Sequence, residues 1–125
     1  MTGPLKLKAQ LLCGAEIAMG PGKADLLEAI AREGSISAAG RSLGMSYRRT
    51  WLLVDEMNRC FRARVVETHA GGSRERGAVL TEPGKAALAA YRDLEAQSAA
   101  ITDSDAYRQL SELVRETPLP AKSAG

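Results

Sequence analysis

Residues 35–61 constrain the fold most strongly, because they encode two short helices that meet across a glycine turn. Ser37 is suited to cap a first helix that runs through Leu43, and Gly44 allows the tight turn that bulkier residues resist. Ser46 is suited to cap a second helix that runs to about Cys60. The apolar residues of this second helix recur at helical spacing and are expected to face the core: Tyr47, Trp51, Val54, Met57 and Phe61.

The opposite side of this second helix is polar and starts with basic residues. It carries Ser46, Arg48, Arg49, Leu52, Asp55, Glu56 and Arg59. In a helix-turn-helix, the second helix lies in the major groove of DNA with its N-terminal residues at the base edges. Arginine at that position can donate two parallel hydrogen bonds to guanine, and serine hydroxyls can bind phosphates. The pattern therefore predicts a DNA-reading helix, and the alternative is a solvated helix face with Ser46 as a simple cap.

The segment after the helix pair changes from helical to strand periodicity. Residues 64–68 and 78–81 are expected strands, and the loop between them holds three glycines and two arginines. A hairpin in this position is the wing of a winged helix-turn-helix. Its Arg74 and Arg76 are expected to enter a minor groove or to contact the flanking phosphates.

The start of the chain supplies the remaining elements of such a domain. Residues 5–13 begin with alternating apolar and polar side chains, which predicts one strand with a buried face. Residues 22–33 have helical spacing, and Gly34 is a suitable stop. The expected fold class is therefore mainly α with a small β-wing.

A long helix is expected to follow the wing, from about Glu82 to Ile101, with Thr81 as its cap. Four of its residues follow a heptad-like spacing that suits packing against a partner helix: Ala87, Tyr91, Leu94 and Ile101. This seam predicts a homodimer, and the alternative is that the helix covers the core of its own domain. We assign residues 1–101 to one DNA-binding domain with its dimerisation helix, and residues 102–125 to a short helix capped by Ser104 and a flexible tail.

Charge is distributed unevenly along the chain. Residues 41–76 contain eight arginines and four acidic residues, which gives +4, whereas the whole chain of 125 residues carries +2. An arginine-rich middle suggests a surface that meets an anionic polymer, and an ordinary solvated surface is the alternative.

Other classes of function find little support in the sequence. The single His69 and the two cysteines show no metal-ligand spacing, and no nucleophile and base can be paired, so we expect neither an enzyme nor a bound cofactor. The cysteines are expected to be buried free thiols. No apolar run is long enough to span a membrane and no secretory signal is evident, which predicts a cytoplasmic protein.

The stretch GSISAAGRSLGMSYRRTWLLVDEMN, followed by a glycine-rich wing and GAVLTEPGK, resembles the N-terminal DNA-binding domain of the ModE-type molybdate-responsive regulators. The resemblance runs from about Leu5 through Gln97. It implies that residues 46–49 begin the recognition helix, that Ser35 and Ser37 flank the preceding helix and that residues 72–77 form the wing. The candidate DNA-binding residues are Ser35, Ser37, Ser46, Tyr47, Arg48, Arg49, Arg59, Ser73, Arg74 and Arg76.

The resemblance implies a sequence-specific transcriptional regulator linked to molybdate metabolism or transport, with a palindromic double-stranded operator. Full-length members of the family carry C-terminal β-barrel modules that sense molybdate, and this chain stops about where those modules would begin. We therefore expect a standalone form that binds molybdate weakly or not at all. The alternative function is a winged-helix protein-interaction module without specific DNA binding.

Overall fold

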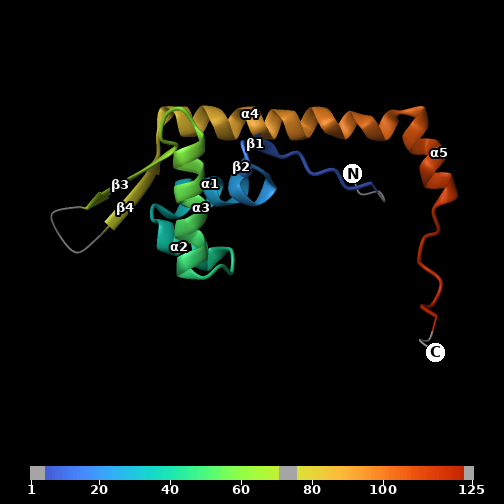
Figure 1. Ribbon diagram of the computed structural model, residues 1–125, viewed down its shortest axis with the longest axis horizontal. Helices are drawn as coiled ribbons and strands as arrows, with labels where there is room; N and C mark the ends of the chain where they lie inside the picture. The colour runs from blue at the N-terminus through green and yellow to red at the C-terminus, as the bar shows by residue number, and fades with distance from the viewer. Residues whose placement is uncertain (1–4, 71–75, 123–125) are drawn as a thin grey trace.

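The computed structural model describes residues 5–70 and 76–122, apart from the side chains of Ala70 and Arg76. The elements in chain order are β1 (Leu11–Cys13), β2 (Glu16–Met19), α1 (Pro21–Glu33), α2 (Ile36–Ser42), α3 (Tyr47–Cys60), β3 (Val66–Ala70), β4 (Arg76–Leu80), α4 (Glu82–Ser98), the 3₁₀ helix η1 (Ala99–Asp103) and α5 (Asp105–Leu113). The predicted class is confirmed: the fold is mainly α, with a helix pair followed by a two-stranded wing. Figure 1 shows α1, α2 and α3 in one body, the wing at one side of it, and α4 crossing the body and continuing beyond it as an arm.

The start of the domain differs from the single strand predicted over residues 5–13. Two short strands, β1 and β2, form an antiparallel hairpin whose turn contains Gly14 at φ 60°. Residues 5–10 are not a strand; Ala9 instead lies against α4, where its carbonyl accepts a hydrogen bond from the Tyr91 hydroxyl at 2.7 Å. The alternation of residues 5–8 was misleading, because period two produces a strand only where a neighbouring strand accepts its hydrogen bonds.

Local capping chemistry fixes the ends of the helix pair. Gly34 ends α1 in the left-handed conformation at φ 76°, and Gly44 makes the turn before α3 at φ 72°. Ser46 caps α3 as predicted, with its hydroxyl accepting from the Arg49 amide at 3.1 Å. The cap of α2 is Ser35 and not Ser37: its hydroxyl accepts from the Ala38 amide at 2.9 Å.

The buried side of α3 is rotated from the predicted one. Val54 and Met57 are buried as expected, but Tyr47 is 65% exposed and Trp51 is 38% exposed. Thr50 lies in the core in their place, with its hydroxyl donating to the Ser46 carbonyl at 2.7 Å.

The close crossing of α2 and α3 explains this rotation. A Cβ on Gly40 of α2 would lie 2.2 Å from Thr50 Oγ1, so the small residues at this crossing let the two helices approach. A broad aromatic ring would not fit between helices at that separation.

The wing is joined to both neighbouring helices. β3 and β4 pair antiparallel, and Asn58 of α3 fixes their base: its side-chain oxygen accepts from the amides of Val65 at 2.8 Å and Val66 at 3.2 Å, and its amide donates to the Val66 carbonyl at 3.1 Å. At the start of α4, a Cβ on Gly84 would lie 2.1 Å from the Val65 carbonyl oxygen. The wing, α3 and α4 therefore share one rigid junction.

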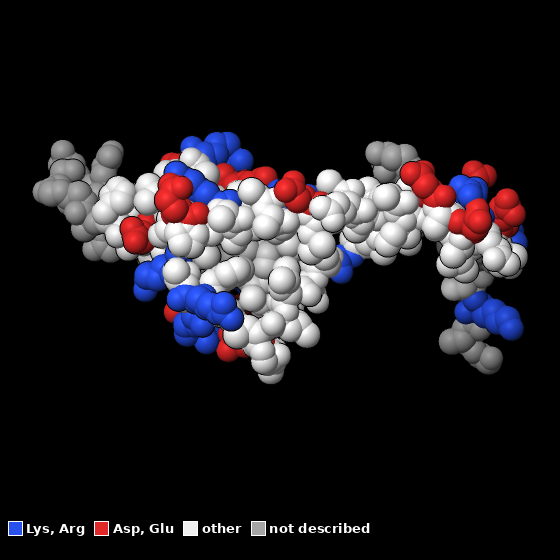
Figure 2. Space-filling view, turned by 90° about the horizontal axis from the view of Figure 1, so that it is seen from above, with Lys and Arg blue, Asp and Glu red and all other residues white. Residues whose placement is uncertain are grey.

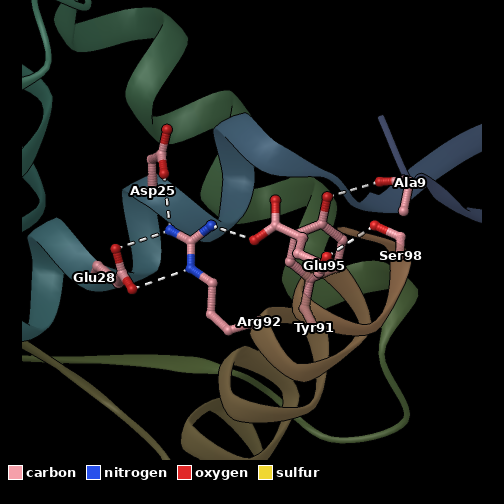
Figure 3. Close-up of polar contacts among 7 residues, drawn as sticks. All are labelled: Ala9, Asp25, Glu28, Tyr91, Arg92, Glu95 and Ser98. Carbon is pink, nitrogen blue, oxygen red and sulfur yellow. Dashed lines mark hydrogen bonds and ion pairs between the residues drawn. The ribbon is translucent and has the colours of Figure 1, made fainter. Parts of the chain in front are cut away.

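Ion pairs fix α4 on the body. The Arg92 guanidinium binds Asp25 and Glu28 of α1 and Glu95 of α4 itself, each at 2.8 Å (Figure 3). These carboxylates raise the pKa of Arg92, and the hydrogen bond from Arg92 holds the pKa of Glu28 below its ordinary value. The orientation of the arm is therefore set by α1.

Candidate nucleic-acid interface

The first turn of α3 presents arginines to solvent on two different sides. Arg48 and Arg49 are both exposed, directly after the Ser46 cap. Arg49 lies at a hollow that also includes Glu16 and Ile17 of β2 and Glu56 of α3. Successive residues of a helix point about 100° apart, so Arg48 lies on the side away from that hollow. The two cations thus cover a broad part of the end of α3 instead of one point.

Arg59 was predicted to bind DNA, but its guanidinium already forms salt bridges with carboxylates of the protein itself. Its guanidinium binds Glu16 of β2 at 3.1 Å and Asp55 one turn earlier at 2.8 Å, and these hydrogen bonds raise its pKa. The Arg59–Glu16 pair fastens β2 to α3, and the salt bridge between the buried Lys23 of α1 and Glu56 at 2.9 Å joins α1 to α3. Because its charge is matched by two carboxylates, Arg59 offers much less to a phosphate than Arg48 or Arg49.

A second group of candidate residues meets where α2, α3 and the wing come together. Ser35, Ser37 and Tyr47 line one hollow there, along with Trp51 and with His69 of β3. Ser35 and Ser37 were expected to flank the helix that precedes the recognition helix; Ser35 caps that helix, α2, whereas Ser37 lies within its first turn. The aromatic and histidine side chains of this hollow were not singled out by the sequence as one group, because their proximity depends on the β3–α3 packing.

The wing residues are placed only in part. Ser73 and Arg74 lie outside the described residues, and Arg76 is the first residue of β4, where it pairs with Ala70. The strands below them are anchored through Asn58. Sequence reasoning did not identify this asparagine, although a polar residue in the last turn of an amphipathic helix and close to a strand suits such a tie.

The four candidate dimerisation residues do not share one surface. Tyr91 is only 3% exposed and packs in the core of its own domain, with its hydroxyl bonded to Ala9. Ala87 is half-buried against the same core. Leu94 and Ile101 are 42% and 47% exposed, further along the arm. The heptad-like spacing thus combined core residues with residues that remain open to solvent.

Surface charge divides the molecule into distinct regions. Figure 2 shows Lys and Arg interspersed with Asp and Glu over the body near the wing, a mostly uncharged stretch along the arm, and mixed charges at α5. Cys13 is exposed and Cys60 is half-buried, so the expectation of buried thiols was wrong; burial raises the pKa of the Cys60 thiol.

Over residues 5–70 and 76–122, no group of three or more His, Cys, Asp or Glu residues could hold a metal ion. No helix in that same part of the chain has the length and apolar character to cross a membrane.

Comparison with known proteins agrees with this geometry. Residues 23–85 match the family described as bacterial regulatory helix-turn-helix protein, lysR family. The chain is 45% identical over 86 residues to the molybdenum-pterin-binding protein MopB of Rhodobacter capsulatus, covering 69% of this chain and 32% of that protein. It is 40% identical over 91 residues to the molybdenum transport protein ModE of Azotobacter vinelandii, covering 73% and 32%.

A third relative is described as a regulator. Identity to the DNA-binding transcriptional dual regulator ModE of Escherichia coli is 40% over 77 residues, which covers 62% of this chain and 29% of that protein. The matched region thus spans about a third of the length of these relatives. The family match over residues 23–85 contains the helix pair that carries the exposed arginines.

Proposed function

Because the chain belongs to the LysR family of bacterial regulatory helix-turn-helix proteins, we propose that it regulates transcription by binding duplex DNA through α3 and the wing. The observation that carries this proposal is the pair of exposed arginines, Arg48 and Arg49, at the capped N-terminus of α3. Similarity to ModE supports the same function. A protein-docking module would not need two exposed guanidinium groups at the position from which such helices reach base edges.

The proposed contacts divide into two kinds. Residues 46–49 meet base edges in the major groove, where arginine recognises guanine through two hydrogen bonds. Hydroxyls and wing arginines bind the sugar-phosphate backbone and orient the helix: Ser35, Ser37, Ser73, Arg74 and Arg76. Arg59 is left out of this set, because Glu16 and Asp55 already bind it.

The names of the relatives support a link to molybdate. They describe a molybdenum-pterin-binding protein and a molybdenum transport protein. We infer that the genes controlled by this chain serve the uptake or use of molybdate.

A homodimer is the proposed working form. One protomer offers one recognition helix, and regulators of this architecture reach specific affinity by placing two helices on half-sites about one helical turn, or a multiple of it, apart. The exposed Leu94 and Ile101 on the largely uncharged arm support a partner at this position (Figure 2). Twofold symmetry makes the operator a palindrome.

Selection from random duplexes, followed by titration of the selected site, tests DNA binding. Arg49→Ala is expected to cost about 1–3 kcal/mol on the selected site and to relax preference at one base position. Arg74→Ala is expected to weaken all sequences nearly alike and to reduce the slope of log affinity against log salt by about 1 per protomer, because one fewer phosphate is neutralised. Arg115→Ala, a change of the same charge beyond α5, is the matched control and should keep both affinity and slope.

The outcome separates the two candidate functions. Equal affinity of the unaltered protein for selected and scrambled duplexes would contradict specific regulation. That result would favour the protein-interaction module.

A further inference from the structure

An aromatic pair stands exposed on the recognition helix. The Tyr47 and Trp51 rings lie one turn apart on α3, with their centroids 6.0 Å apart and their planes inclined by 58°. The chain has only five aromatic residues of the Trp, Tyr and Phe types, so two of the five lie side by side on this surface. Large apolar rings left in solvent at a binding surface mark a place where a partner covers them.

The surroundings of the pair combine apolar residues with hydroxyl groups and an imidazole. The rings border the hollow of about 230 Å³ between α2, α3 and the wing, whose rim includes the hydroxyl residues Ser35, Ser37 and Thr68. The His69 ring lies across the wing over Gly77, its partner in the antiparallel register, where a Cβ would lie 2.4 Å from the imidazole. No acidic residue lines this hollow within the part of the chain that the structure describes.

This combination fits one strand of DNA. Hydroxyls and an imidazole suit phosphate oxygens, and the aromatic rings need an apolar surface beside those phosphates. The C5-methyl of thymine is the apolar group that base pairs present in the major groove. Arg48 and Trp51 are three residues apart on α3 and are therefore neighbours on its surface, so a base edge that reaches the arginine also comes near the Trp51 ring.

We propose that Tyr47 and Trp51 determine specificity by packing against thymine methyl groups in each half-site, while the hydroxyls of the hollow bind a phosphate of the same strand. This inference rests on the proposed function and deepens it. Sequence preference then has two sources, guanine read by arginine and thymine read by the rings.

Deoxyuridine scanning of the selected operator tests the proposal, because it removes only the methyl group. At one or two positions per half-site, exchange of thymine for uracil is expected to weaken binding about fourfold, the effect of losing one buried methyl-sized group. With Trp51→Ala or Tyr47→Ala, the same exchange should have no effect at the position that each ring covers. Tyr47→Phe keeps the ring and should keep the discrimination.

A matched variant and a direct probe of proximity complete the test. Leu52→Ala removes another exposed apolar side chain of α3 and should leave the uracil effect unchanged. Irradiation of an operator with 5-bromodeoxyuridine at the sensitive position should cross-link the DNA to Tyr47 or Trp51, identified by peptide mapping. Circular dichroism and thermal unfolding establish that each variant is folded.

The possible results are distinct. A uracil scan without effect in the unaltered protein would overturn the thymine proposal, and so would an effect that survives both ring-to-alanine variants or disappears only in Leu52→Ala. In each of these cases the protein still binds its operator, and the proposed function stands. Failure to bind any selected duplex would instead overturn the proposed function, and the thymine proposal with it.

Discussion

Single residues decide how closely the helices of this domain approach. Gly40 faces Thr50 at the α2–α3 crossing, and Gly84 faces the Val65 carbonyl where α4 begins. Both contacts leave no room for a Cβ. The orientation of the recognition helix therefore requires glycine at these two positions. Neither glycine touches the proposed DNA surface.

Gly40→Ala is expected to destabilise the domain by about 1–3 kcal/mol, because the new methyl group overlaps the buried Thr50 side chain. Gly22→Ala is the matched control: it also lies in a helix, but its Cβ would meet nothing within 4 Å, so stability should stay the same or rise by up to about 1 kcal/mol. Chemical denaturation of both variants measures the difference. A Gly40→Ala protein as stable as the control would contradict the tight crossing.

The exposed pair on α3 shows what residue patterns predict poorly. Apolar spacing correctly assigned Val54 and Met57 to the core, but it also assigned Tyr47 and Trp51 there. The spacing of apolar residues gives the period of a helix and not its distance from the helix that packs against it. For α3 this distance depends on Gly40, which belongs to α2 and has no apolar side chain that would reveal the contact.

At the scale of elements, Asn58 joins the recognition helix to the wing. Its side-chain amide satisfies the Val65 and Val66 amides and the Val66 carbonyl, and both valines are buried. A buried backbone amide or carbonyl without a hydrogen-bond partner lowers the stability of the fold. The tie therefore holds the two proposed DNA-contacting elements at a constant separation.

Asn58→Ala is expected to lower the free energy of unfolding by about 1–3 kcal/mol, since it leaves two buried amides without a partner. Hydrogen exchange should accelerate most at Val65 and Val66. Asn58→Asp keeps the accepting oxygen and should cost less at these amides, although it places a carboxylate oxygen near the Val66 carbonyl. Unchanged exchange at both valines in Asn58→Ala would show that the wing is held by other contacts.

The ion pairs between α1 and α4 make stability depend on pH. Glu28 has a lowered pKa in the folded protein, mainly through its hydrogen bond from Arg92, so its contribution is present above the carboxyl's ordinary pKa and is lost as the pH falls through the lowered value. Stability measured by denaturation should thus decline in acid. Glu28→Gln should show a shallower decline over the same range, and parallel curves would contradict this role of Glu28.

At the scale of the whole molecule, the arm carries the proposed twofold contact. Leu94→Glu places a charge on the exposed part of α4 that we propose to bury in the dimer, so the dimer should dissociate while the protomer stays folded. Sedimentation at micromolar concentration measures the change. Leu52→Glu, a matched charge on an exposed leucine of α3, should stay dimeric. A monomer mass for the unaltered protein, with the operator bound one chain at a time, would refute the dimer.

The order of elements was predictable because it depends on local chemistry. Ser46, Thr81 and Ser104 cap helices as expected, and Gly34 and Gly44 occupy the turns that require their backbone freedom. Predictions failed where distant parts of the chain meet. The strand β2 was missed, and Arg59 was assigned to DNA although its carboxylate partner Glu16 lies 43 residues away in sequence.

The tie through Asn58 has a consequence for how the protein responds to its surroundings. An amide side chain carries no formal charge, so neither salt nor acid acts directly on the three hydrogen bonds that join the helix to the wing. The affinity of the arginines for DNA phosphates, by contrast, falls steeply as ionic strength rises. Affinity and geometry are therefore controlled separately. A change in ionic strength or pH alters how long the protein stays on a DNA site. The angle between α3 and the wing, and with it the sequence preference, is kept.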